Sequence, residues 1–205
     1  MAVFTEKELS EWLINGSINQ SAVRNQGIGI VKGIRYELFK HFEIRTFVKA
    51  LKSRNDEDYN KYLQNLTRKV SLGKYGRDND NKRTDSKIKW GAARKCINLL
   101  ARSIVYNAFI GEKFKINIED FETYGIMNRL ELPLDSNSID GLKHDADTYE
   151  ITVPNNALNN FQIITLTHHK SKKIQKLAQE IARARNICRV NLDVHYWRKN
   201  PKEEE

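Results

Sequence analysis

Two lysines near the middle of the chain, Lys89 and Lys95, are candidates for a nucleophilic amine. At about 100° per residue along a helix, Lys89 lies in line with Cys96 and Leu100, whereas Lys95 shares its side with Arg102. A lysine in a first helical turn beside an apolar stripe loses hydration and feels the positive end of the helix dipole, and both effects favour the neutral amine. We therefore expect Lys89 to be a nucleophile and Lys95 to stay solvated and charged. The alternative is that Lys89 packs only its aliphatic stem.

A carboxylate follows a proline turn in the segment Leu-Pro-Leu-Asp-Ser, residues 132–136. Asp135 could begin a helix there, and as a simple N-cap it would stabilise that helix by about 1 kcal/mol. The helix dipole would also keep the carboxylate ionised, as a catalytic aspartate facing a developing cation requires. Both roles remain open for Asp135.

Near the end of the chain, Asp193 and Trp197 are four residues apart and would be neighbours on one face of a helix. A carboxylate beside an indole can hydrogen-bond to a nucleobase and stack on it at the same time. The alternative is that the pair only packs and caps.

The elements that must position these residues are predicted to be helices. Only three prolines and ten glycines interrupt the sequence, and the apolar residues between them recur at three- and four-residue spacing. The pattern predicts a helix after a capping box at Thr5, helices over 34–51, 56–70, 86–109, 157–167 and 171–184, one from Asp135 or Ser136, and a short terminal one. Residues 71–85 are polar and predict an exposed loop. The expected fold class is all-α.

The charge of the chain favours a polyanionic partner. Lys and Arg number 35 against 26 Asp and Glu, which gives a net charge of +9. Basic residues concentrate between Thr67 and Lys95, where a solvated loop is the alternative to phosphate binding. The residues that we expect to contact phosphates are Lys74, Arg77, Lys82, Arg83 and Arg94.

Several classes of protein are disfavoured. No apolar run approaches the roughly 18 residues of a membrane span, and the first residues carry acids where a signal peptide carries bases, so we expect a cytoplasmic protein. Cys96 and Cys188 are too few for a disulfide framework or an iron–sulfur cluster. The adjacent His168 and His169 lack a ligand partner at metal-binding spacing, and we expect neither metal nor cofactor.

Taken together, Lys89 in SKIKWGAARK, Asp135 in LPLDS, and Asp193 with Trp197 in NLDVHYW resemble the helix-hairpin-helix DNA glycosylases. The resemblance is closest to the archaeal 8-oxoguanine branch. That family joins a Schiff-base lysine at a helix start to a proline turn with a catalytic aspartate and to a later leucine-aspartate segment. Here no GxGxK hairpin precedes the lysine, and the lysine-to-aspartate interval is long, so the nucleophile stays open between Lys89, Lys95 and Lys87.

The resemblance implies a single glycosylase-like domain over residues 1–200, with two helical lobes, a cleft between them and a disordered tail at 201–205. The amine of Lys89 would attack C1′ of a flipped, modified or damaged nucleotide in double-stranded DNA while Asp135 stabilises the cationic sugar. Three residues would hold the extruded base, namely Asp193, Trp197 and Lys95. The enzyme would act as a nucleoid-associated monomer, with or without lyase activity in addition to base excision.

Two other functions compete with this interpretation. In a non-enzymatic DNA-binding module of similar fold, Lys89 would be one more phosphate contact. A nuclease would need clustered carboxylates for a metal, and Asp140, Asp145 and Asp147 lie near one another in sequence without a nuclease motif to organise them.

Overall fold

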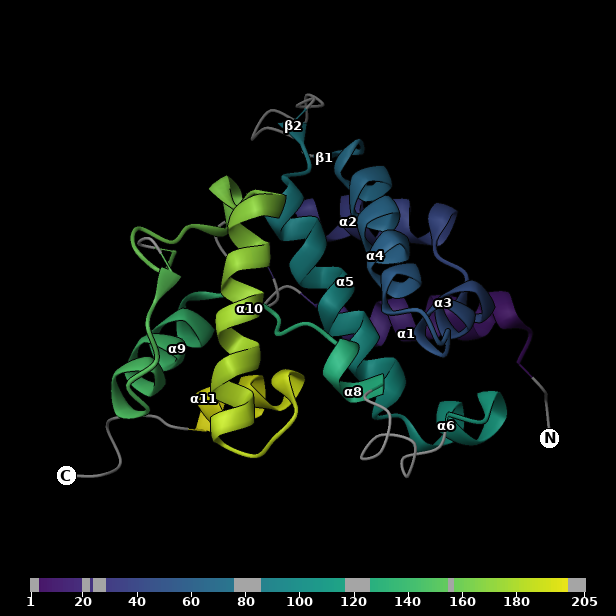
Figure 1. The fold of residues 1–205 in the computed structure, drawn as a ribbon. Helices are drawn as coiled ribbons and strands as arrows, with labels where there is room; N and C mark the ends of the chain where they lie inside the picture. Colours follow the sequence, from purple (N-terminus) through teal and green to yellow (C-terminus); the bar gives the residue numbers. More distant parts are fainter. Residues whose placement is uncertain are drawn as a thin grey trace.

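The computed structural model describes residues 4–19, 23, 29–75, 86–116, 126–154 and 157–198, and these are predominantly helical (Figure 1). The helices are α1 (Glu6–Ser17), α2 (Ile30–His41), α3 (Ile44–Leu51), α4 (Asp56–Ser71), α5 (Trp90–Val105), α6 (Ala108–Phe114), α8 (Ile126–Arg129), α9 (Ser136–Thr148), α10 (His168–Ala184) and α11 (Leu192–Arg198), with 3₁₀ turns η3 (Ile163–Thr165) and η4 (Arg189–Asn191). The predicted helical class is confirmed. None of the described helices is long and apolar enough to cross a membrane.

Helix starts follow the sequence signals closely. Thr5 caps α1 in a complete capping box with Glu8, whose carboxylate accepts the Thr5 N–H at 2.8 Å. Asn55 caps α4, which carries acidic residues in its first turn and basic residues in its last, as the helix dipole favours. The predicted helices over 56–70 and 171–184 correspond to α4 and α10.

Two predicted helices have different boundaries. The helix expected over 34–51 is interrupted, because Phe42 and Glu43 adopt extended backbone conformations and separate α2 from α3. The central helix expected over 86–109 begins only at Trp90. Ser86, the first residue of the predicted helix, instead belongs to strand β2 (Ser86–Lys87), which pairs antiparallel with β1 (Lys74–Tyr75).

The helix expected over 157–167 is not formed. Residues 157–160 make a turn, Asn160 has a positive φ of 48°, and only η3 is helical in this stretch. Asparagine side chains compete for backbone hydrogen bonds and tolerate left-handed conformations, so the local sequence Asn159-Asn160 favours a turn over a helix.

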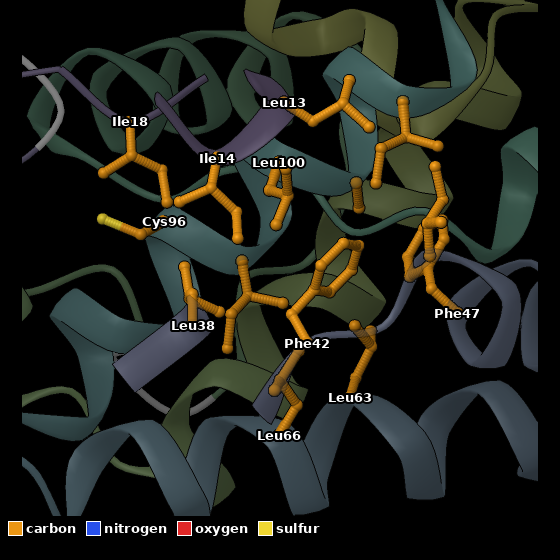
Figure 2. Packing of buried hydrophobic residues seen from close by; sticks show 14 of the residues in the cluster. Leu13, Ile14, Ile18, Leu38, Phe42, Phe47, Leu63, Leu66, Cys96 and Leu100 are labelled. Carbon is orange, nitrogen blue, oxygen red and sulfur yellow. The ribbon is translucent and has the colours of Figure 1, made fainter. Parts of the chain in front are cut away.

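The buried hydrophobic residues form two clusters. The first joins α1 to α6 and α8, and Figure 2 shows its centre, where Leu38 and Phe42 face Ile14 and Leu100. The second joins α9, α10 and α11 to the segment that contains Leu132 and Leu134. Trp90 packs against the second cluster although the rest of α5 contributes to the first. The two clusters therefore meet at the start of α5.

Helix α5 runs through the middle of the molecule, between α4 and α10 (Figure 1). Twelve of its sixteen residues are buried, including the polar residues Arg94, Lys95 and Asn98. Gly91 lets the chain approach closely, since a methyl group there would collide with the carbonyl oxygen of Ile163 in η3. A helix enclosed on this many sides must supply buried partners for its own charged side chains.

Candidate active site

A lysine and an aspartate meet between the two hydrophobic clusters. Lys95 extends from α5, and its Nζ lies 3.1 Å from Oδ2 of Asp135 at the start of α9. The two side chains are only 9% and 13% exposed, so the pair is largely withdrawn from water. An amine and a carboxylate at this distance can exchange a proton directly, which is the arrangement that an activated lysine nucleophile needs.

Asp135 is held in place by the helix that it caps. Its Oδ1 accepts the Ser138 N–H at 2.9 Å, and the Ser138 hydroxyl accepts the Asp135 N–H at 2.7 Å. One carboxylate oxygen is thus used by the capping box while the other faces Lys95. The cap role and the pairing role, which the sequence left as alternatives, occur together in the same residue.

The proline turn before Asp135 is anchored to α10. The Gln175 side chain accepts the Leu132 N–H at 3.0 Å and donates to the Leu132 carbonyl at 2.8 Å. Leu132 and Leu134 are buried in the second cluster on either side of Pro133. These contacts fix where the Asp135 carboxylate lies relative to α5.

The expected burial of the lysines is reversed. Lys89 is exposed and stands at the N-cap position before α5, and Lys87 is exposed in β2. Among the three lysines left open, Lys95 is the buried one and the one that reaches Asp135. The prediction that Lys89 enters a dry cleft while Lys95 is solvated is wrong, because the polar side of α5 also faces protein.

Arg94 is unsuited to the phosphate contact predicted for it. Its side chain is 5% exposed and binds both carboxylate oxygens of Glu131, with Nε–Oε2 2.8 Å and Nη2–Oε1 2.7 Å. A third hydrogen bond of 3.0 Å goes to the Thr67 hydroxyl. All three sides of the guanidinium fork are therefore occupied within the protein.

The carboxylate of Glu131 is strongly stabilised in its ionised form. Burial raises its pKa, but the charge and hydrogen bonds of Arg94, the charge of Arg189 and a hydrogen bond from Asn98 outweigh burial and hold the pKa at about 2. The Asn98 amide donates to Oε2 at 3.0 Å. This network joins α4, α5 and the segment leading to Asp135.

The pair predicted to hold a base is divided between core and surface. Asp193 is 3% exposed and forms an ion pair with Arg102, which lies seven residues beyond Lys95 on α5. Trp197, one turn later on α11, is 56% exposed. Asp193 thus secures α11 against α5, and only Trp197 presents an open face to solvent.

The basic segment is described only in part. Lys74 is exposed in β1, where its Cα pairs in register with that of Lys87 in β2. Arg77, Lys82 and Arg83 lie outside the described residues, as does the predicted tail at 201–205.

The described residues contain no group of three or more His, Cys, Asp or Glu side chains that could hold a metal ion. Asp145 is instead buried, bonded to Arg185 at 2.6 Å and to the Tyr196 hydroxyl at 2.9 Å. Asp140 is exposed and lies 3.5 Å from Lys143. Two of the three carboxylates considered for a nuclease thus have other partners.

Sequence reasoning missed Arg102 and Glu131. The spacing of seven places Arg102 on the same helix face as Lys95, and the sequence analysis expects that face to be solvated, whereas the structure covers it. Glu131 directly precedes the Leu-Pro-Leu-Asp segment and carried no signal of its own. Three basic residues, Arg94, Lys95 and Arg102, lie on the otherwise apolar helix α5, and this pattern could have predicted buried carboxylate partners for them.

Comparison with family models, curated proteins and solved structures found no match for this chain.

Proposed function

We propose that this protein is a DNA N-glycosylase in which Lys95 is the nucleophile and Asp135 the catalytic carboxylate. The proposal rests on one observation above others, the 3.1 Å contact between a buried lysine amine and a buried aspartate. The residue types are those that the glycosylase resemblance requires, with the lysine moved from Lys89 to Lys95.

The chemistry follows from the pair. Asp135 Oδ2 accepts a proton from the Lys95 ammonium, and the neutral amine attacks C1′ of a flipped nucleotide as the bond from C1′ to the base breaks. The base leaves with the bonding electrons and takes up the proton that Asp135 received from Lys95. The carboxylate is then ionised again and stabilises the positive charge on the sugar. Opening of the sugar ring leaves an imine on Lys95, from which the 3′ phosphate can be eliminated.

The surroundings of the pair support this assignment. Lys95 comes from an element of the first hydrophobic cluster and Asp135 from the second, and in this proposal the two clusters correspond to the two lobes. The Arg102–Asp193 ion pair holds α11 on α5, which makes Asp193 a positioning residue in this proposal. Trp197 then remains as the exposed aromatic surface for a base.

Phosphate binding is assigned to the hairpin before α5. Lys74 and Lys87 are exposed and directly opposite each other across β1 and β2, so both can contact the same phosphate. Lys89 is exposed two residues further on. DNA affinity should therefore fall with rising salt, by about 0.9 log units of affinity per log unit of salt for each phosphate contact.

The test is borohydride trapping on duplexes that carry different modified bases. The wild-type protein should become covalently attached to at least one substrate, Lys95→Gln should not, and Lys89→Gln should be trapped like the wild type. Asp135→Asn keeps an oxygen for the Ser138 cap but loses the charge, so base release should fall about 10²–10³-fold while duplex affinity is unchanged.

Several results would count against the proposal. Trapping of Lys95→Gln would exclude Lys95 as the nucleophile, and loss of trapping in Lys89→Gln would return that role to Lys89. Salt-dependent duplex binding without base release on any substrate would identify a non-enzymatic DNA-binding module, in which Lys95 and Asp135 only hold the two clusters together. Strand cleavage that a chelator abolishes would identify a nuclease.

A further inference from the structure

A large cleft lies between α4 and α10, apart from the Lys95–Asp135 pair. Its volume is about 1160 Å³, and neither Lys95 nor Asp135 lines it. Figure 1 shows the two helices that form its walls on either side of α5. The cleft is thus a feature of the molecule that the proposed chemistry does not use.

The lining of this cleft is strongly basic. Six basic side chains line it against two carboxylates, and both carboxylates already have cationic partners. Asp56 pairs with Arg129 at 2.8 Å, and Glu131 pairs with Arg94 at 2.7 Å. The charge that remains for a ligand is therefore positive.

Much of the positive charge that lines the cleft lies in a row of side chains along α10. Lys172, Lys176 and Arg183 line the cleft and are exposed. Lys176 is 4.0 Å from Glu180, whereas no carboxylate of the described residues lies within 4.0 Å of Lys172 or Arg183. At 1.5 Å per residue the row spans about 16 Å along the helix, which suits a chain of several phosphates better than one.

A fourth cation is held rigidly at the cleft. The Arg189 guanidinium donates to the carbonyls of Leu130 at 3.0 Å, Arg129 at 3.1 Å, Asn128 at 3.2 Å and Gln175 at 3.3 Å. These bonds occupy its three nitrogens and fix its position, and its charge also acts on Glu131, which is paired with Arg94. Arg189 therefore adds positive potential at the cleft and does not itself need to contact an anion.

Neutral groups in the cleft suit nucleobases. Asn60 and Gln179 line opposite walls, and amide side chains pair with the donor and acceptor edges of bases. At one end, His168 lies edge-on to Trp90 with ring centroids 5.9 Å apart, and the Gln64 amide reaches the His168 ring at 2.9 Å. Aromatic rings of this kind provide surfaces for stacking unpaired bases.

We infer that the α4–α10 cleft binds a single-stranded segment of nucleic acid, with its phosphates along Lys172, Lys176 and Arg183 and its bases toward the amides and Trp90. The cleft and the Lys95–Asp135 pair share no residue, so this inference can be tested independently of the glycosylase proposal.

The experiment is fluorescence anisotropy with a labelled oligothymidine of about eight nucleotides, within the site sizes of single-strand binding folds. The variant carries Lys172→Gln and Arg183→Gln, and its control carries Lys7→Gln and Lys49→Gln, two exposed lysines outside the cleft. We expect the cleft variant to bind about tenfold more weakly at low salt and its salt slope to fall by about 1.4, or 0.7 for each lost contact. The control should stay within about twofold, with unchanged circular dichroism.

The other outcomes contradict the inference in distinguishable ways. Equal weakening in the control variant would mean that general charge, and not the cleft, carries the binding. Tighter binding of duplex than of single strand, lost in the cleft variant, would assign the cleft to duplex DNA. Full competition by thymidine monophosphate at the oligonucleotide's concentration would indicate a mononucleotide site. Loss of oligothymidine binding in Lys95→Gln would show that the two sites are one.

Discussion

Two adjacent residues of α5 make ion pairs of very different character. Arg94 binds both oxygens of Glu131 and also the Thr67 hydroxyl, so each of its three side-chain nitrogens is hydrogen-bonded within the protein. Lys95 pairs at 3.1 Å with the carboxylate of Asp135, whose other oxygen caps a helix. Both pairs connect α5 to residues 131–135.

The difference indicates which pair is structural and which can do chemistry. A guanidinium stays protonated in proteins and, once bound on all sides, cannot take part in a covalent step. A lysine amine can lose its proton, and Lys95 has donors to spare beside Asp135. We therefore expect the Arg94 pair to control stability and the Lys95 pair to control activity.

Breaking the Arg94 pair should have the largest effect on stability. Glu131→Gln leaves the Arg94 guanidinium buried without a countercharge, and we expect the free energy of unfolding to fall by about 3–5 kcal/mol. Urea denaturation measures it. Lys95→Met also removes a buried countercharge, but Asp135 keeps its cap hydrogen bond and the helix dipole, so we expect a smaller loss of about 2 kcal/mol. Equal losses in both variants would remove the contrast between the pairs.

Acid should weaken the same pair. The folded-state pKa of Glu131 is about 2, below its ordinary value of 4.5, so its stabilisation is complete above pH 4.5 and is lost as the pH falls toward 2. The free energy of unfolding of the wild type exceeds that of Glu131→Gln at neutral pH, and this difference should shrink by about 3 kcal/mol as the pH falls from 4.5 to 2. Urea titrations at several pH values measure the change. A constant difference between the two proteins would show that Glu131 does not titrate in this window.

A smaller effect should follow from the third contact of Arg94. Thr67→Val keeps the side-chain shape but removes the hydroxyl that accepts from Nη1, and we expect a loss of about 1.5 kcal/mol. Thr46→Val is the control, because the Thr46 hydroxyl donates to the Glu43 carboxylate at the surface of the protein. If the two valine variants unfold at the same urea concentration, the Thr67 contact contributes nothing measurable.

The sequence by itself determined the local structure. The Thr5 capping box, the Asp135 cap and the charge gradient of α4 are interactions between near neighbours, so their patterns are visible in the chain. The all-helical class follows from the same short-range periodicity. The helix predicted over 157–167 failed where Asn159 and Asn160 gave a competing local signal.

Only the tertiary structure decided which lysine is buried. An amphipathic pattern predicts one buried face, but α5 lies where two hydrophobic clusters meet, and its polar face is covered as well. The partners of Lys95 and Arg102 are 40 and 91 residues away in sequence, at Asp135 and Asp193. Charged side chains are buried only where such partners arrive, and long-range packing brings them there because an unpaired buried charge is too costly.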